Sequence, residues 1–335
     1  MSFIPGASNS IADVDGLKIG HASNAKLKSG VTVVIADKPA TAAVSILGGA
    51  PGTRETDLLE PHNLVETVDA IVLSGGSAFG LDAASGVQAW LRENGRGFEV
   101  GMHKIPIVPA AILFDLINGD YKDWSRYPPY RELGFEAAES AIASTSHGSI
   151  GAGTGALTAN LKGGLGTASA RVGKFTVAAI VAVNAMGSAT MGNTRHFWAA
   201  PFEQGDEFGG FGLPTATFDT GLPIKFRDQT GLEKSNTTIA IIATDAVMTK
   251  AQAKRLAISA HDGFSRALWP AHTPFDGDTV FAMATGASEI SPEISDFIDI
   301  CAASAAVMAR AIARGVYSAK PTDNDLMPTW QQRFG

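Results

Sequence analysis

The sequence predicts an α+β fold in which helices and strands are stacked as separate layers. Short apolar runs rich in β-branched residues alternate with segments of helical periodicity along the 335 residues. Their order does not repeat as a regular strand–helix–strand unit, which favours α+β layers over a doubly wound parallel sheet. Hydrophobic residues form 45% of the chain and charged residues 18%, so the chain can bury a large core. Length alone allows two domains, but we expect residues 1–335 to form a single domain.

Three apolar runs near the start of the chain predict strands, at residues 31–36, 42–47 and 69–74. The third run is followed by the sequence SGGSAFG, in which the glycines indicate a tight turn. Apolar residues then recur at helical spacing between Leu81 and Leu91. A buried helix is therefore expected after the turn.

The middle of the chain is less regular. Residues 118–134 are aromatic, charged and interrupted by proline, which predicts an excursion over the surface. Residues 148–166 are rich in glycine, so this segment must turn tightly or let another group approach its backbone closely. Residues 175–184 predict a buried strand that ends at the polar Asn184, and residues 199–235 form a long connection spaced by glycine and proline.

The C-terminal part of the chain predicts two more buried strands, at residues 239–245 and 279–285. It also predicts two helices. The first begins with the capping-box pattern of Thr249–Gln252 and runs to about Leu268. The second spans about 293–314, after an N-cap at Ser291 and before a stop at Gly315. The very small side chains of this helix indicate close packing, on a sheet or on a partner subunit.

Charge and composition exclude several classes of function. The net charge is −7 with no block of like charge, which argues against nucleic acid and anionic membrane surfaces as partners and favours small, neutral substrates. The N-terminus lacks the features of a signal peptide, and the longest uncharged run, Phe175 to Thr194, contains too many polar residues for a membrane helix. The single cysteine, Cys301, allows no internal disulfide, so a cytoplasmic protein is expected.

Two local patterns are weak evidence for a cofactor or a metal. The turn SGGSAFG does not match a dinucleotide or P-loop fingerprint, and a tight turn of Gly75, Gly76 and Ser77 that lines a pocket is the better interpretation. The histidines are scattered, and Asp276 and Asp278 supply fewer oxygens than a Mg²⁺ or Ca²⁺ site needs. We therefore expect neither a cofactor nor a metal ion.

The same two carboxylates have a second interpretation. Asp276 and Asp278 flank Gly277 immediately before the strand predicted at 279–285. An ordinary Asp-Gly turn explains this pattern. A paired-carboxylate site, in which one group is held ionised or the two share a proton, explains it as well.

A cluster of small hydroxyl and amide residues, Ser235 to Thr238, leads directly into the strand predicted at 239–245. The cluster is typical of a turn, but it also fits a self-processing nucleophile. If the chain were cut before Thr237, a free α-amine would lie on the same residue as the hydroxyl. Such an amine titrates near ~7.7–8.0, so a useful fraction is neutral at pH 7 and able to accept the hydroxyl proton. The cut itself can come from attack of Thr237 Oγ on the Asn236 carbonyl, followed by hydrolysis of the ester.

A resemblance to a known family favours the second interpretation of both patterns. Six stretches of the chain carry it, in order: GGSAFGLDAASGVQAWL, VPAAILFDL, GAGTGALTANLKGGLG, VAVNAMG, NTTIAIIATDA and WPAHTPFDGDTVFAMAT. Together they resemble the family of L-aminopeptidase/D-esterase-amidases (DmpA-like), which includes the β-aminopeptidases and the nylon-oligomer hydrolase. The Asn-Thr junction is closer to the nylon-oligomer hydrolase than a Gly-Ser junction would be.

This resemblance implies a four-layer αββα sandwich, similar in architecture to N-terminal nucleophile hydrolases but connected differently. It implies a precursor that cleaves itself between Asn236 and Thr237 into chains of residues 1–236 and 237–335. Members of the family assemble as homotetramers of the cleaved heterodimer, and they need no metal or cofactor.

The resemblance also implies roles for individual residues. Thr237 corresponds to the nucleophile and its freed amine to the proton acceptor. Asn184 corresponds to an asparagine whose amide donates to the oxyanion, and Lys162 to a lysine that acts electrostatically on the carbonyl or on Thr237. Asp276 and Asp278 correspond to a pair that orients the nucleophile or binds a substrate ammonium group.

The substrate pocket is expected to include Gly75, Gly76, Ser77 and Phe114. Some members of the family carry tyrosine where this chain has Phe114 in ILFDL. A phenol donates a hydrogen bond and phenylalanine does not, so substrate preference does not transfer from those members.

The sequence therefore predicts an aminopeptidase or amidase that acts on short peptides or on β- or ω-amino amides. Two alternatives remain open at this point. The same nucleophile would transfer the acyl group to an amine in an enzyme of the ornithine-acetyltransferase type. An uncleaved protein that binds a small molecule in its glycine-rich turns would have no nucleophile of this kind.

Overall fold

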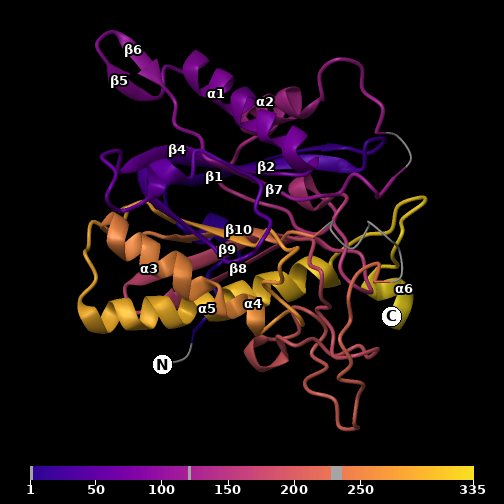
Figure 1. Ribbon diagram of the computed structural model, residues 1–335. Coiled ribbons are helices and arrows are strands. Elements are labelled where there is room, and N and C mark those ends of the chain that lie inside the picture. Colours follow the sequence, from indigo (N-terminus) through magenta and orange to yellow (C-terminus); the bar gives the residue numbers. More distant parts are fainter. Residues whose placement is uncertain (1–2, 120–121, 228–235) are drawn as a thin grey trace.

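The computed structural model describes residues 3–119, 122–227 and 236–335. They form four layers: two sheets pack face to face, and helices cover each outer face (Figure 1). The αββα sandwich that the family resemblance implies is confirmed. Residues 228–235, which include Ser235 of the hydroxyl cluster named above, lie outside the described residues.

The elements follow one another along the whole chain. The strands are β1 (Leu17–Asn24), β2 (Ser29–Ile46), β3 (Thr53–Arg54), β4 (Thr67–Ser74), β5 (Phe98–Val100), β6 (His103–Ile105), β7 (Ala110–Ile112), β8 (Gly164–Val172), β9 (Phe175–Val183), β10 (Ile239–Thr244) and β11 (Thr279–Ala284). The α-helices are α1 (Ala83–Glu93), α2 (Tyr130–Glu139), α3 (Lys250–Ala260), α4 (Asp262–Ser265), α5 (Ile294–Tyr317) and α6 (Trp330–Phe334). Short 3₁₀ helices are η1 (Ile11–Asp13), η2 (Asp57–Leu59), η3 (Ser77–Asp82), η4 (Gly151–Gly153) and η5 (Ala200–Phe202).

Strand β2 connects the two sheets. Hydrogen bonds between the described strands follow the order β3–β7–β4–β2–β11–β10–β9–β8, and β1 pairs with β2. Residues 31–35 of β2 pair with β4, residues 41–46 pair with β11, and the register shifts between Ile35 and Ala40. The two strands predicted at 31–36 and 42–47 are therefore one strand, because the exposed residues between them carry the chain from one layer to the other without a turn.

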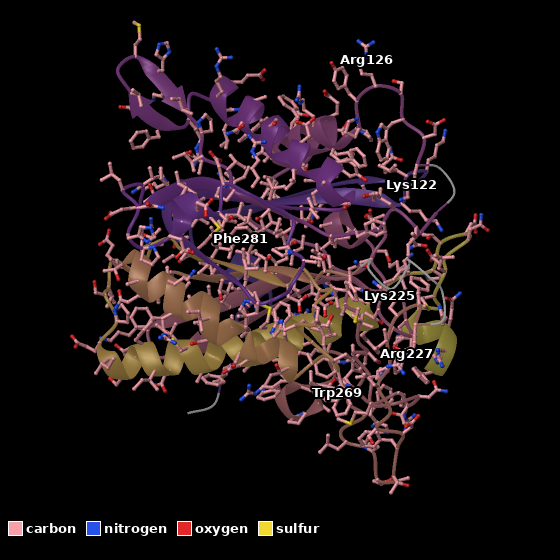
Figure 2. The ribbon with its side chains drawn as sticks, in the orientation of Figure 1. Lys122, Arg126, Lys225, Arg227, Trp269 and Phe281 are labelled. Atoms are coloured by element: carbon pink, nitrogen blue, oxygen red, sulfur yellow. The ribbon has the colours of Figure 1, made fainter. Side chains whose placement is uncertain are left out.

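Alternation along the strands builds three apolar cores. Successive side chains of a strand point to opposite faces, so each central strand contributes to two cores. The core between the sheets includes Val34, Ile71, Leu73, Ile180, Ile241 and Phe281 (Figure 2). Helices α1 and α2 bury Val31, Val33, Val72, Val87 and Leu91 against the first sheet. Helices α3 and α5 bury Val177, Val181, Ile242, Leu256 and Val307 against the second.

The predicted helix ends were partly wrong. The capping box of Thr249 with Gln252 is confirmed, but α3 ends at Ala260 and the short α4 follows it. Helix α2 begins at Tyr130, inside the segment predicted as a surface excursion. Helix α5 begins at Ile294 rather than after Ser291, because Glu293 caps it through a reciprocal pair with Asp296.

Helix α5 also continues past Gly315, the predicted stop, to Tyr317. Gly315 lies where α5 crosses β8, and a Cβ at this position would come within 2.9 Å of the Gly166 nitrogen. Glycine at position 315 therefore allows α5 to approach β8 closely. It does not end the helix, as its conformational freedom had suggested.

The same crossing supports a prediction on stability. A Cβ on Gly166 would lie 1.8 Å from the Ala311 carbonyl oxygen of α5, so Gly166→Ala must push the helix off the sheet. We expect the variant to lose about 3 kcal/mol or more of unfolding free energy, measured by denaturant titration. Gly221→Ala is the control, since its methyl group would meet only the side chain of Asp219. Equal stability of the two variants would contradict this account.

Candidate active site

Three segments that are distant in the sequence meet at one edge of the second sheet. Strands β10 and β11 are parallel, so both begin at this edge, and β9 is antiparallel to β10 and ends there. Asn236 and Thr237 precede β10, the pair Asp276 and Asp278 precedes β11, and Asn184 follows β9. The topology therefore brings together three of the polar segments that the sequence analysis selected separately.

Thr237 lies against the peptide bond that precedes it. Its side chain is buried, with the residue only 4% exposed, and its hydroxyl donates to the Asn236 carbonyl oxygen. The Gly277 N–H donates to the same oxygen at 3.2 Å. A Cβ on Gly277 would lie 2.8 Å from Thr237 Oγ, so glycine at this position leaves room for the hydroxyl. The Thr237 hydroxyl, the Asn236 carbonyl and a second donor to that carbonyl thus lie in contact.

Backbone bonds hold Thr237 in this position. Its N–H donates to the Asn184 carbonyl oxygen at 3.0 Å. The next amide, that of Thr238, donates to Asp278 Oδ1 at 2.9 Å. These two bonds connect the entrance of β10 to the end of β9 and to the turn before β11.

The two carboxylates are buried and accept hydrogen bonds from backbone amides around Thr237. Asp276 accepts the amides of Met186 at 3.1 Å and of Thr273 at 2.9 Å. The other oxygen of Asp278, Oδ2, accepts a hydrogen bond from the backbone amide of His272 at 3.1 Å and one from its ring Nδ1 at 2.8 Å. Burial, and then the charge of Asp278, raises the pKa of Asp276. The two carboxylates thus connect the segments that carry Met186, Thr238 and Thr273. The backbone amides that they accept favour the ionised form of each carboxylate.

Asn184 is held by both ends of its side-chain amide. Its Oδ1 accepts the Leu157 amide at 2.9 Å, and its Nδ2 donates to the Phe114 carbonyl oxygen at 3.0 Å. The predicted asparagine is therefore beside Thr237, and its backbone oxygen accepts the Thr237 amide.

Lys162 lies with a different set of residues. Its ammonium group donates to Asp325 Oδ2 at 2.7 Å and to Thr322 Oγ at 3.1 Å, both in the C-terminal segment after α5. Burial lowers the pKa of Lys162, and Asp325 opposes that effect. Among the described contacts, Lys162 has no hydrogen bond to Thr237, and its side chain anchors the C-terminal segment instead.

The glycine turn after β4 is closely packed. A Cβ on Gly76 would fall 2.1 Å from the Tyr130 ring, and one on Gly75 would fall 2.2 Å from Asp115 Oδ2. The Gly76 amide donates to Asp115 Oδ1 at 2.8 Å. Ser77, at φ 53°, begins η3 and is half-buried. This turn reaches Asn184 through Asp115 and its neighbour Phe114, whose carbonyl accepts the asparagine amide.

Lys225 is a site residue that the sequence analysis missed. Its side chain is buried, with the residue 1% exposed, and it lies on the right of Figure 2, between Lys122 and Arg227. Its Nζ donates to three oxygens, those of the Leu157 and Asn184 carbonyls at 3.0 and 3.3 Å and Asn184 Oδ1 at 3.2 Å. Burial lowers the pKa of Lys225 to about 7, against the charge of Asp276, which raises it. The only signal in the sequence is a lone lysine within the apolar stretch GLPIKF.

A hollow of about 410 Å³ adjoins the carboxylate pair. Its lining is mainly apolar and consists of Met186, Leu222, Ile224, Pro270, Pro274 and Phe275, with Thr273 and Arg227. Met186 and Thr273 are the residues whose amides bond Asp276, so the hollow shares two residues with the site. In the parts of the chain that the structure describes, no three His, Cys, Asp or Glu residues are placed to hold a metal ion.

The fold and the site together define a class of protein. Solved structures with the same architecture include a β-aminopeptidase from a Burkholderia species, with a TM-score of 0.73 and 20% identity over 99% of this chain and 94% of the other. They also include the L-aminopeptidase D-Ala-esterase/amidase of Ochrobactrum anthropi, described as a variant of the Ntn hydrolase fold, with a TM-score of 0.71 and 20% identity over 99% and 94%. The chain thus has the fold of this class of N-terminal nucleophile hydrolases.

The chain belongs to peptidase family S58, whose profile matches residues 9–326. It is 40% identical to an uncharacterized aminopeptidase of Mycobacterium tuberculosis, over 97% of this chain and 98% of that protein. It is also 28% identical to a 6-aminohexanoate-oligomer endohydrolase of Paenarthrobacter ureafaciens, over 82% of this chain and 74% of that protein. The family resemblance inferred from the six motifs is confirmed, and the protein is a hydrolase that acts on amide bonds. Among the described residues, no helix is long and apolar enough to cross a membrane.

Proposed function

We propose that this chain cleaves itself between Asn236 and Thr237, and that the new N-terminal threonine then hydrolyses amide bonds in short peptides or in β- or ω-amino amides. One observation carries the proposal. The Thr237 hydroxyl already contacts the Asn236 carbonyl oxygen, and the Gly277 N–H donates to that oxygen from a second direction. These contacts place a hydroxyl group and a hydrogen-bond donor at the peptide bond before Thr237, as self-cleavage requires.

Self-cleavage follows from the geometry in two steps. Thr237 Oγ attacks the Asn236 carbonyl carbon, and the negative charge develops on the oxygen that faces the Gly277 N–H. The C–N bond then breaks, the proton from the hydroxyl ends on the Thr237 nitrogen, and an ester joins Asn236 to Thr237 Oγ. Water hydrolyses this ester, which leaves a carboxylate on Asn236, and a hydroxyl and a free amine on Thr237.

Turnover uses the same atoms. The freed amine accepts the proton of Thr237 Oγ while the oxygen attacks the substrate carbonyl, which occupies the place of the Asn236 carbonyl. The leaving amine takes that proton, and water then releases the acyl group. The Gly277 N–H donates to the oxyanion, and Asp276 and Asp278 hold the surrounding loops in position.

Substrate preference depends on the hollow beside Asp276. Its apolar lining with one arginine, Arg227, fits an alkyl or aromatic side chain, or the methylene chain of an ω-amino acid. The relative that acts on 6-aminohexanoate oligomers, by its name, supports the second possibility. We place the substrate here rather than at Gly75 and Gly76, since those glycines pack against Asp115 and Tyr130.

We also propose a homotetramer of the cleaved heterodimer in the cytoplasm. The β5–β6 hairpin supports association, because it exposes Phe98, Val100, Ile105 and, at 91%, Met102. A chain with one cysteine needs no disulfide and is therefore suited to a reducing compartment. Light scattering of the purified protein measures the number of chains.

The denatured intact mass of freshly purified protein tests the proposal directly. We expect two species that together account for the 34.7 kDa chain, with the smaller one beginning at Thr237. A single full-length mass that persists on incubation would contradict the proposal, because Thr237 would then lack its amine.

A further inference from the structure

Lys225 has no role in the chemistry described so far, although it occupies the centre of the site. It is fully buried, and its three hydrogen bonds use every N–H of an ammonium group. Two of the three acceptors belong to Asn184, the residue whose carbonyl oxygen also bonds the Thr237 amide. The nitrogens of Lys225 and Thr237 bond that oxygen at 3.3 and 3.0 Å, so they lie no further apart than the sum of these distances, 6.3 Å.

We propose that Lys225 is a positioning residue for the nucleophile: its ammonium group fixes Asn184, and its positive charge keeps the amine of Thr237 neutral after self-cleavage. The inference rests on the proposed function, since the amine exists only in a cleaved chain. Lys225 lies in the 1–236 chain and would act on Thr237, the first residue of the 237–335 chain.

The first half of the proposal follows from the hydrogen bonds. Asn184 Oδ1 accepts from both Lys225 and the Leu157 amide, and its Nδ2 donates to Phe114. Because both ends of its amide are hydrogen-bonded, the Asn184 side chain has a fixed orientation. The Asn184 backbone carbonyl accepts from both the Thr237 amide and Lys225 Nζ. Loss of the ammonium group would remove one buried donor from each of three oxygens: the Leu157 carbonyl, the Asn184 carbonyl and Asn184 Oδ1.

The second half follows from the charges around the amine. Asp276 and Asp278 lie at the same edge of the sheet, and their negative charge favours a protonated amine, which cannot act as a base. His272 is paired with Asp278, and Arg227 lines the adjoining hollow. A cation at 6.3 Å or less opposes the carboxylates, since two positive charges at this distance are unfavourable. The Lys225 Nζ and the Thr237 amine compete for a proton. The three oxygen acceptors around Lys225 stabilise its ammonium form, so Lys225 takes the proton and the Thr237 amine stays neutral.

The pKa of Lys225 agrees with such sharing. Burial brings it down to about 7, close to the ordinary range of an α-amine. Two neighbouring nitrogens with similar pKa values compete for a proton, and the Thr237 amine is a base whenever Lys225 carries it.

The test compares Lys225→Met with Lys250→Met. Lys250 is a matched control, since it too is a buried lysine with three oxygen acceptors, in its case the carbonyls of Leu58, Asn63 and Val65.

The pKa of the Thr237 amine is measured without a substrate, from the pH dependence of its acetylation by trace acetic anhydride. Mass spectrometry of the 237–335 chain reports the acetylation. In Lys225→Met we expect this pKa to rise by about one pH unit, and the acid limb of kcat/KM for an aminoacyl p-nitroanilide to move with it. Lys250→Met is expected to keep the wild-type pH profile.

The outcomes separate the two proposals. A wild-type chain that stays intact removes the proposed function, and this inference with it. A wild-type chain that is cleaved, with a Lys225→Met variant that is cleaved and has an unchanged amine pKa, overturns the inference and leaves the proposed function standing. A loss of activity that is equal at every pH would also overturn it, because a structural role alone gives that result.

A Lys225→Met variant that folds but remains uncleaved is followed by Lys225→Ala with added propylammonium. Cleavage restored by the amine, and not by 1-propanol, supports the role of the ammonium group on Asn184. Cleavage that the amine does not restore overturns it.

Discussion

The Thr237→Ala variant is expected to remain a single chain of 335 residues and to hydrolyse none of the amides that the wild type hydrolyses. Without Oγ, no group of the residue can attack the Asn236 carbonyl, although the Gly277 N–H still donates to it. Removal of a covalent nucleophile lowers kcat by about 10³-fold or more in other hydrolases. Denatured intact mass reports the cleavage, and release of p-nitroaniline from aminoacyl p-nitroanilides reports the activity.

Thr237→Ser is the matched control, because serine keeps the hydroxyl and loses only a methyl group. It should still be cleaved, at a rate closer to wild type than to Thr237→Ala. A Thr237→Ala protein that is cleaved and active would assign the chemistry to another residue. The melting temperature of the Thr237→Ser variant should stay near that of the wild type, since serine keeps the hydroxyl that bonds the Asn236 carbonyl oxygen.

The Asp278→Asn variant is expected to slow self-cleavage by about 10²-fold or more and to lower the free energy of unfolding by about 2–3 kcal/mol. The Asp278 carboxylate accepts the Thr238 amide on one oxygen, and the backbone amide and ring Nδ1 of His272 on the other. An asparagine must turn its NH₂ group toward one of these donors, so a buried N–H loses its acceptor. The segment that carries Thr237 then loses its connection to the turn before β11, and the hydroxyl is displaced from the carbonyl.

Asp245→Asn separates the effect on stability from the effect on cleavage. Asp245 is also buried and accepts a backbone amide, that of Thr176 at 2.9 Å, but it lies at the opposite end of β10 from Thr237. We expect a comparable loss of stability by denaturant titration and a wild-type rate of cleavage by intact mass. Equal slowing of cleavage in the two variants would mean that Asp278 acts only through the stability of the fold.

Several elements could be predicted from the sequence because their signals are local. The strands predicted at 175–184, 239–245 and 279–285 agree with β9, β10 and β11 to within one residue at each end. Their apolar residues are continuous because both faces of each strand are buried in a four-layer fold. The capping box at Thr249 was also predictable, since its two reciprocal bonds join residues three apart.

Other elements depend on contacts that no local pattern contains. Two strands were predicted on either side of residues 37–39, yet β2 passes through them, because β4 pairs with β2 before and after the register shift and β11 pairs with residues 41–46. Helix α2 begins within an aromatic, proline-containing segment because Tyr130, Leu133 and Ala137 are buried against the first sheet. Gly315 remains inside α5 because β8 approaches the helix there.

The candidate site shows the same division. The motifs and the family resemblance pointed to Asn236–Thr237, to Asp276 and Asp278, and to Asn184, and the structure brings these together. They also pointed to Lys162, which the structure pairs with Asp325. Lys225 supplies a buried ammonium group at Asn184 instead, from a connection without periodicity or motif.

The sequence by itself determined the layers, the family and the residue types at the candidate nucleophile, since hydrophobic alternation, capping pairs and short motifs are properties of neighbouring residues. Only the tertiary structure decided which charged side chain reaches that nucleophile. The parallel pairing of β10 with β11 and the antiparallel pairing with β9 place three distant segments at one edge, where the ammonium group of Lys225 donates to Asn184. A lysine in an apolar stretch carries no sign of its three acceptors until the fold surrounds it, because those acceptors come from residues 41 and 68 positions away.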